Sequence, residues 1–273
     1  MLGEGDTNSA DNGVIRPTRQ PTPFEDVGKQ LSQFVEGVIA MGKAIVEGLG
    51  HLAIYAKRSE LIEQAGWLPH PVAPFDMIPF DQDAAAVGAM LEAHYKDKWA
   101  DIRNQFAARV DTYDIDDEAK ATYREALELH QLGHYRAVVR LLFPEIERVA
   151  CKEVYLGDQY ERRIDGKKDG LITSLKSLRE AAGNNLGVSE IGDIQYSLSL
   201  FQRMSDHLYE KVGEDNFAIR KYEGDPVPNR HAAMHGLVIY KTFNNSINTL
   251  IMTEFMFMVI NSLKSHINKH QQD

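Results

Sequence analysis

The sequence predicts an all-α protein. In several segments the apolar residues recur at steps of three and four, as on one face of a helix, and no segment alternates apolar and polar residues as a half-buried strand does. Acidic residues precede several of these segments and glycines follow them, which is the expected polarity of helix ends. The chain has 273 residues, 43% of them hydrophobic and 26% charged. This length and composition are typical of a soluble globular protein with a sizeable core.

The N-terminal part divides by composition. Residues 1–23 are rich in Gly, Asp, Asn, Ser, Thr and Pro and lack periodicity, so we expect a disordered tail. Residues 24–56 have a helical pattern that is apolar around most of its circumference, which is typical of a helix buried in a core or against a partner. Residues 66–83 contain four prolines and are predicted to form a loop. We therefore expect an N-terminal helical region over 24–112 and a helical domain over 113–273.

Two helices are predicted between the proline-rich loop and Gly133. Asp81 or Asp83 is a suitable N-cap for a long alanine-rich helix that reaches about residue 112. The next helix, over about 115–132, begins with a run of acidic residues and is followed by Gly133. Both boundaries rest on local signals at the helix ends.

The remaining helices are less regular. The segment 134–155 is helical in pattern with Pro144 inside it, where we expect a kink. Further helices are predicted at 169–182 and about 190–212, and a final one at about 245–269.

Composition also narrows the class of protein. The net charge of −10 argues against a protein that coats duplex nucleic acid over a wide face, but not against a local RNA-cutting centre. A lone cysteine, Cys151, and an opening stretch without a signal-peptide pattern favour the cytoplasm. The most apolar run, Ile247–Ile260, is too short to span a membrane and contains Glu254, so we expect a buried helix and no membrane contact.

The chemistry of the chain concentrates in the stretch NRHAAMHG, residues 229–236. Asn229 and Arg230 follow two prolines, which suit the start of a helix, and the first turn of a helix favours an anion. Arg230 carries a planar, permanently charged group that matches phosphate oxygens. His231 and His235 are four residues apart and therefore share a helix face. Histidine titrates near neutral pH and can serve as a general acid or base.

These groups suit attack of an RNA 2′-hydroxyl on its own adjacent phosphate, a reaction that needs proton transfer and charge stabilisation but no metal or cofactor. Two other interpretations fit the same spacing. A His-x-x-x-His pair on a helix can ligate a metal, but Ala232 follows the first histidine where metalloproteases have glutamate, and no cysteine cluster completes a site. The arginine and histidines can also be solvated or bonded within the core.

The stretch PNRHAAMHG, followed by the apolar helix NNSINTLIMTEFMFMVI, resembles the HEPN superfamily. The signature of that superfamily is an arginine followed by a polar residue, with a histidine four to six residues on. Arg230 and His235 match its two invariant positions and His231 matches the polar one. The upstream segment GHYRAVVRLLFPEIERV (133–149) resembles a helix found in HEPN proteins of abortive-infection and related defence systems. The resemblance covers about residues 115–265.

The resemblance implies an HEPN-like helical bundle with an N-terminal helical extension, acting as a metal-independent endoribonuclease or an inactive relative. It also implies a homodimer with two motifs facing each other across a cleft. His235 would transfer the proton, Arg230 would hold the scissile phosphate, and His231 and Asn229 would orient the site. Tyr240 is a further candidate for stacking or hydrogen bonding. A stress or antiphage effector with RNA as substrate, and with a regulatory protein or antitoxin as a possible partner, is the expected role.

Further candidates accompany this assignment. Arg162 and Arg163 lie in a basic segment that can guide RNA, although a solvated loop has the same composition. Glu147 is a candidate partner for Arg230. Two other functions stay open: a catalytically silent HEPN-like module that binds RNA, a nucleotide or a protein, and a purely structural helical protein. Retention of both Arg230 and His235 favours the enzyme, because binding alone does not need that pair.

Overall fold

A computed structural model describes most of the chain after residue 49. The described residues are 50, 53–153, 200, 203–204, 206–208, 210–213 and 215–270, without the side chains of 218 and 262–270. All of them belong to one compact unit, Gly48–Asp273. Over these ranges the chain forms helices and turns and no strand, which confirms the all-α prediction there. The predicted tail 1–23, the predicted helix 169–182 and most of the predicted helices 24–56 and 190–212 lie outside the described residues.

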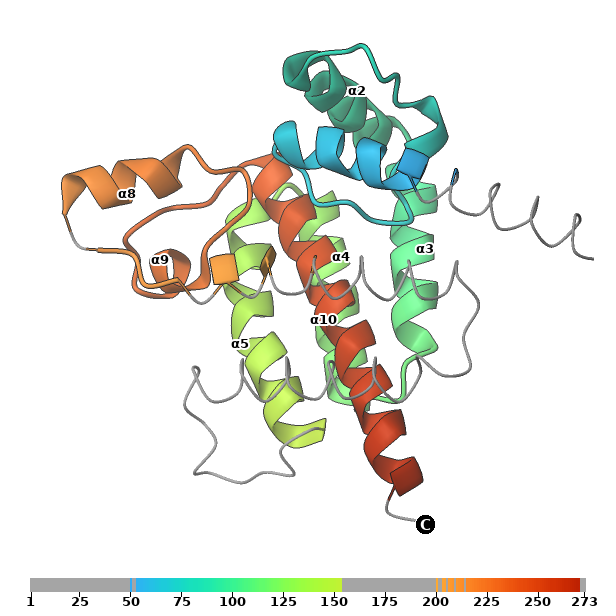
Figure 1. Cartoon of the computed structure of the whole chain (residues 1–273). Coiled ribbons are helices and arrows are strands. Elements are labelled where there is room, and N and C mark those ends of the chain that lie inside the picture. The colour runs from blue at the N-terminus through green and yellow to red at the C-terminus, as the bar shows by residue number, and fades with distance from the viewer. Residues whose placement is uncertain are drawn as a thin grey trace, which may run out of the picture. The chain divides into compact units, whose positions relative to one another are not determined.

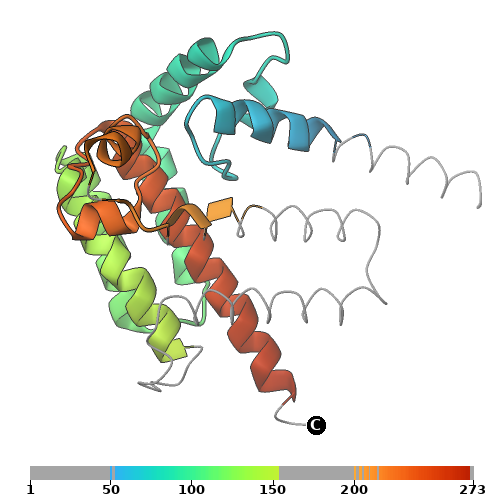
Figure 2. The same ribbon diagram turned by 60° about the vertical axis from the view of Figure 1, so that its left-hand side comes forward.

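Four helices form the bundle that carries the core. They are α3 (Trp99–Asp111), α4 (Asp117–Gln131), α5 (Tyr135–Glu153) and α10 (Phe243–His270). Helix α10 packs against each of the other three, and α4 also packs against α3 and α5 (Figures 1 and 2). Helix α10 is therefore the element around which the bundle is built.

The apolar run Ile247–Ile260 is buried within the chain itself. Leu250, Met252 and Phe257 are fully buried, in agreement with the prediction of a core helix. Burial of these side chains within the chain leaves the run little apolar surface for a second copy to cover. The run therefore does not argue for a dimer. Among the described residues, no helix is long and apolar enough to cross a membrane.

The ends of α4 follow the predicted signals. The Asp116 side chain accepts a hydrogen bond from the backbone N–H three residues on (2.6 Å) and so caps the helix. Hydrogen bonds from Arg148 to Asp116 (2.8 and 2.9 Å) hold the pKa of this carboxyl well below its usual range. Gly133 ends the helix at φ 77°, in the left-handed region, and the next backbone N–H bonds back to the Leu129 carbonyl (2.8 Å).

The single long helix predicted up to residue 112 is wrong. The chain instead forms α2 (Ala84–Asp97), capped by the Asp83 side chain, and then α3. Lys98 separates them with non-helical backbone angles (φ −106°, ψ 14°). The break lets α2 stack its buried Tyr95 on the Trp67 ring (5.2 Å between centroids), while α3 turns into the four-helix bundle (Figure 1). Tertiary packing overrides the continuous helical pattern here.

The first described helix covers residues 53–64 and leads into the predicted loop, which contains only the short 3-10 helix η1 (Phe75–Met77). Residues on both sides of position 112 contribute to one core, so the predicted boundary there does not coincide with a break in the packing. Pro144, where the sequence predicts a kink, lies on the exposed side of α5, and the helix continues through it.

Candidate functional site

The motif stretch forms a short helix, α9 (Arg230–Met234), as predicted. Asn229 is its N-cap and accepts a hydrogen bond through its side-chain oxygen from the Ala232 N–H (2.9 Å). Arg230 is the first helical residue and His235 is the C-cap. Gly236 then takes a left-handed conformation (φ 71°), which reverses the chain. The helix is thus one turn long, with the arginine and the second histidine at opposite ends.

Glu147 of α5 holds Arg230. The Arg230 Nε atom lies 2.6 Å from the Glu147 Oε1 atom, and the two side chains are 16% and 22% exposed. The Nε–H bond of Arg230 is not directed at that oxygen, so the contact is an ion pair without a hydrogen bond. The hypothesis that Glu147 is the partner of Arg230 is therefore confirmed, and the pair fixes α9 to α5.

The two histidines lie together beyond this ion pair. The ring centroids of His231 and His235 are 4.4 Å apart, with the rings tilted by 38°. His235 is exposed, whereas His231 is partly buried. The expectation that the two imidazoles share a face is confirmed, and the outer one is open to solvent.

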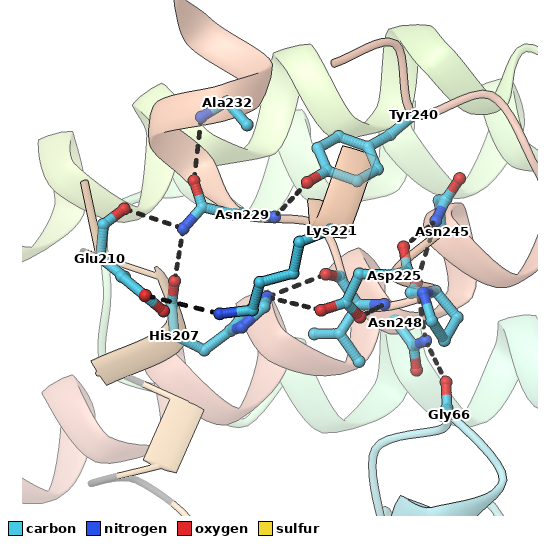
Figure 3. A network of polar contacts seen from close by, with 12 residues as sticks. Gly66, His207, Glu210, Lys221, Asp225, Asn229, Ala232, Tyr240, Asn245 and Asn248 are labelled. Carbon is cyan, nitrogen blue, oxygen red and sulfur yellow. Dashed lines mark hydrogen bonds and ion pairs between the residues drawn. The ribbon is translucent and has the colours of Figure 1, made fainter. Parts of the chain in front are cut away.

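Hydrogen bonds to neighbouring parts of the chain hold Asn229 in place (Figure 3). Its Nδ2 atom donates to the carbonyl oxygens of His207 (2.6 Å) and Glu210 (3.0 Å), and its backbone N–H donates to the Tyr240 hydroxyl (3.1 Å). Asn229 and Tyr240 are both buried, and burial raises the pKa of Tyr240 to about 12. Both residues therefore position the motif through the fold, and Tyr240 presents no ring surface for a base to stack on.

Two asparagines of α10 anchor the loop before the motif, and sequence reasoning missed them. The Asn248 side chain donates to the carbonyls of Gly66 (2.9 Å) and Pro226 (3.0 Å) and accepts from the Leu68 N–H (2.9 Å). Asn245 donates to the same Pro226 oxygen (3.0 Å) (Figure 3). The signal that marks them is a pair of asparagines three residues apart at the start of an apolar helix.

Replacement of Asn248 by Asp should lower the free energy of unfolding by about 2–4 kcal/mol. The change preserves the shape but removes both donors, which leaves the Gly66 carbonyl without this donor and the Pro226 carbonyl with Asn245 alone, and it places a carboxylate against both oxygens. Urea unfolding measures the loss. Asn244→Asp is the matched control, because this partly exposed neighbour makes no such contacts with the described residues and a negative charge in the first turn of α10 is favourable, so its unfolding midpoint should not fall. Equal effects of the two substitutions would contradict the anchoring role.

A separate cavity of about 200 Å³ lies beside this loop. Its walls include Trp67, His207 and Asp225, and Arg203 forms an ion pair with Glu63 at 2.7 Å on its lining. Neither Arg230 nor the motif histidines line it. The cavity is therefore distinct from the motif.

A buried polar cluster lies elsewhere in the bundle. Glu254 of α10 is 1% exposed; its Oε2 atom pairs with His70 Nε2 (2.8 Å), and its Oε1 atom accepts from Arg109 Nε (2.7 Å) and from the Tyr113 hydroxyl. The other ring nitrogen of His70, Nδ1, accepts from the Val72 N–H (3.2 Å). The ring proton is therefore on Nε2 and is donated to Glu254.

The charges in this cluster follow from its contacts. Burial disfavours ionisation of Glu254, but the hydrogen bonds from His70 and Tyr113 and the charge of Arg109 outweigh it and hold the pKa of Glu254 below its usual value. Burial likewise lowers the pKa of His70, and the nearby carboxylate only partly offsets this. The pair is a charged carboxylate with a neutral imidazole, and it joins the loop at His70 to α10.

In the part of the chain that the structure describes, no three His, Cys, Asp or Glu side chains are grouped as metal ligands. Arg162 and Arg163 lie outside the described residues. In comparisons with known proteins, no family model matches the chain, and no curated protein or solved structure is significantly similar to it.

Proposed function

We propose that this chain is a metal-independent endoribonuclease of the HEPN type. The observation that carries the proposal is the geometry of α9. An arginine held by an ion pair begins the helix, and two imidazoles 4.4 Å apart lie along it, the outer one open to solvent. These are the groups that cleavage of RNA by its own 2′-hydroxyl requires.

In this mechanism His235 transfers the proton and Arg230 stabilises the charge that develops on the phosphorus centre. Glu147 orients the guanidinium through Nε, and no described residue accepts a hydrogen bond from the Nη atoms. The outer fork of Arg230 therefore suits two phosphate oxygens. His231 packs against His235 and sets its orientation. The bond that forms joins the 2′-oxygen to phosphorus, the bond that breaks is the one to the 5′-oxygen, and a proton moves from the first oxygen to the second.

The proposal includes a homodimer in which two motifs face each other. Met234 (43% exposed) and Ile239 (56% exposed) flank His235 and supply apolar surface for such a contact. The enzyme would act in the cytoplasm as a stress or antiphage effector, with RNA as substrate and with a regulatory protein or antitoxin restraining it.

Cleavage of mixed RNAs by the purified chain in the presence of EDTA tests the proposal. We expect cleavage to persist in the chelator and the products to end in a 2′,3′-cyclic phosphate, since the attacking oxygen belongs to the RNA. Loss of cleavage in EDTA, or products with a 5′-phosphate, would identify a metal-dependent hydrolysis and overturn the assignment of Arg230 and His235.

A second candidate is a silent module that binds RNA, a nucleotide or a protein. The observation that favours it is the ion pair itself, because Glu147 neutralises the charge of Arg230 and reduces its attraction for phosphate. Binding of RNA without cleavage under any of these conditions would make this the better assignment.

A further inference from the structure

Helix α5 carries two exposed arginines on one face. Arg136 and Arg140 are four residues apart, so they lie on the same side of the helix and about 6 Å apart along its axis. Both side chains are exposed. Their spacing along the helix is comparable to the separation of successive phosphates in a nucleic-acid strand.

Neither arginine has an acidic partner among the described residues, in contrast to most arginines there. Seven of the ten described arginines form ion pairs with Asp or Glu: Arg58, Arg103, Arg109, Arg124, Arg148, Arg203 and Arg230. Arg220 is the third without such a pair. The stretch 134–144 contains no acidic residue, although the whole chain has a net charge of −10. Like charges at this spacing destabilise a helix, so the fold itself does not explain the two arginines.

The same face of α5 leads to the motif. Glu147 follows Arg140 by seven residues, almost two full turns, and so lies on nearly the same side of the helix, about 10 Å further along. Glu147 is the residue that holds Arg230. Arg136, Arg140 and the start of α9 therefore lie on nearly the same side of α5, with the buried Phe143 between them, so RNA bound to the two arginines reaches α9 over the part of the chain that covers Phe143.

We propose that Arg136 and Arg140 bind successive phosphates of single-stranded RNA and direct the strand toward Arg230 and His235. This inference rests on the proposed function for the direction of the strand, but it assigns a binding surface that catalysis alone does not require. The two guanidinium groups neutralise the backbone without reading the base sequence.

Fluorescence anisotropy with a 2′-O-methyl oligoribonucleotide tests this surface apart from cleavage, because that probe lacks the attacking hydroxyl. In the full chain, Arg136→Gln and Arg140→Gln should each weaken binding about tenfold. Together they should also make the plot of log K against log salt shallower by about 1.4, or 0.7 for each lost phosphate contact. Arg220→Gln, at an exposed arginine of α8 (Asn216–Glu223), is the matched control and should change neither quantity. Thermal unfolding should be the same for wild type and all four variants.

The outcomes separate this inference from the proposed function. Unchanged affinity and salt dependence in the double variant, or no binding of the probe by the wild type, would overturn the phosphate surface. Displacement of the probe by an acidic peptide as readily as by unlabelled RNA would also overturn it, in favour of a protein partner. If the arginines are needed for binding but natural RNA is never cut, the surface stands and the nuclease proposal fails.

Discussion

Substitution of His235 by Ala should reduce the rate of RNA cleavage by about 10²–10⁴-fold, the usual contribution of a positioned general acid or base. The protein should stay folded, because the His235 side chain is exposed and only its backbone closes the end of α9. The measurement is the single-turnover rate on a labelled RNA in EDTA, together with a thermal unfolding curve. His134→Ala is the matched control, since this exposed histidine lies outside the motif and its substitution should leave the rate unchanged.

Arg230→Lys should lose about as much activity in the same assay, because an ammonium group keeps the charge but lacks the planar fork. Glu147→Gln should cost less, since it releases the guanidinium from its ion pair but leaves it in the site. Cleavage at the wild-type rate by both His235→Ala and Arg230→Lys would show that the activity resides elsewhere in the chain.

The features that the sequence predicts well depend on neighbouring residues. Asp116 and Gly133 bound α4 because a side-chain cap and a left-handed glycine act within one turn of the helix. The start of α9 at Arg230 follows in the same way from the prolines and Asn229 before it. The spacing of His231 and His235 likewise needs no knowledge of the rest of the fold.

The features that the sequence does not predict depend on residues far apart in the chain. Lys98 interrupts a continuous helical pattern because α2 is oriented by the stacking of Tyr95 on Trp67, whereas α3 is oriented by its packing in the bundle. Asn248 bonds to Gly66 across 182 positions, and nothing in an apolar helix identifies that partner. The sequence offers Glu147 only as a candidate partner for Arg230, and it is the packing of α9 against α5 that brings the two together. The pattern of a single sequence indicates which face of each helix is apolar, but it does not indicate which of these faces pack against one another.

Substitution of Glu254 by Gln should lower the free energy of unfolding by about 1–3 kcal/mol, the usual cost of leaving a buried polar group without its hydrogen-bond partner. A glutamine oxygen can still accept from Arg109 and Tyr113. Its amide nitrogen, however, would face the protonated Nε2 of His70, so that two donors meet. The His70 ring cannot exchange its proton to relieve this, because Nδ1 already accepts from the Val72 N–H. Glu92→Gln removes an exposed ion pair with Lys96 and should have no measurable effect.

The pH dependence of unfolding checks the same cluster. In wild type, the pKa of His70 is lowered from 6.5, so stability should decline as the pH falls below 6.5, where the unfolded chain takes up a proton that the folded one does not. The pKa of Glu254 is lowered from 4.5, so its contribution is complete above 4.5 and is lost as the pH falls further. The difference in the free energy of unfolding between wild type and Glu254→Gln should therefore be present at pH 7 and should shrink as the pH falls below 4.5. A difference that is as small at pH 7 as that of Glu92→Gln would mean that Glu254 is not a charged, buried anchor of the bundle.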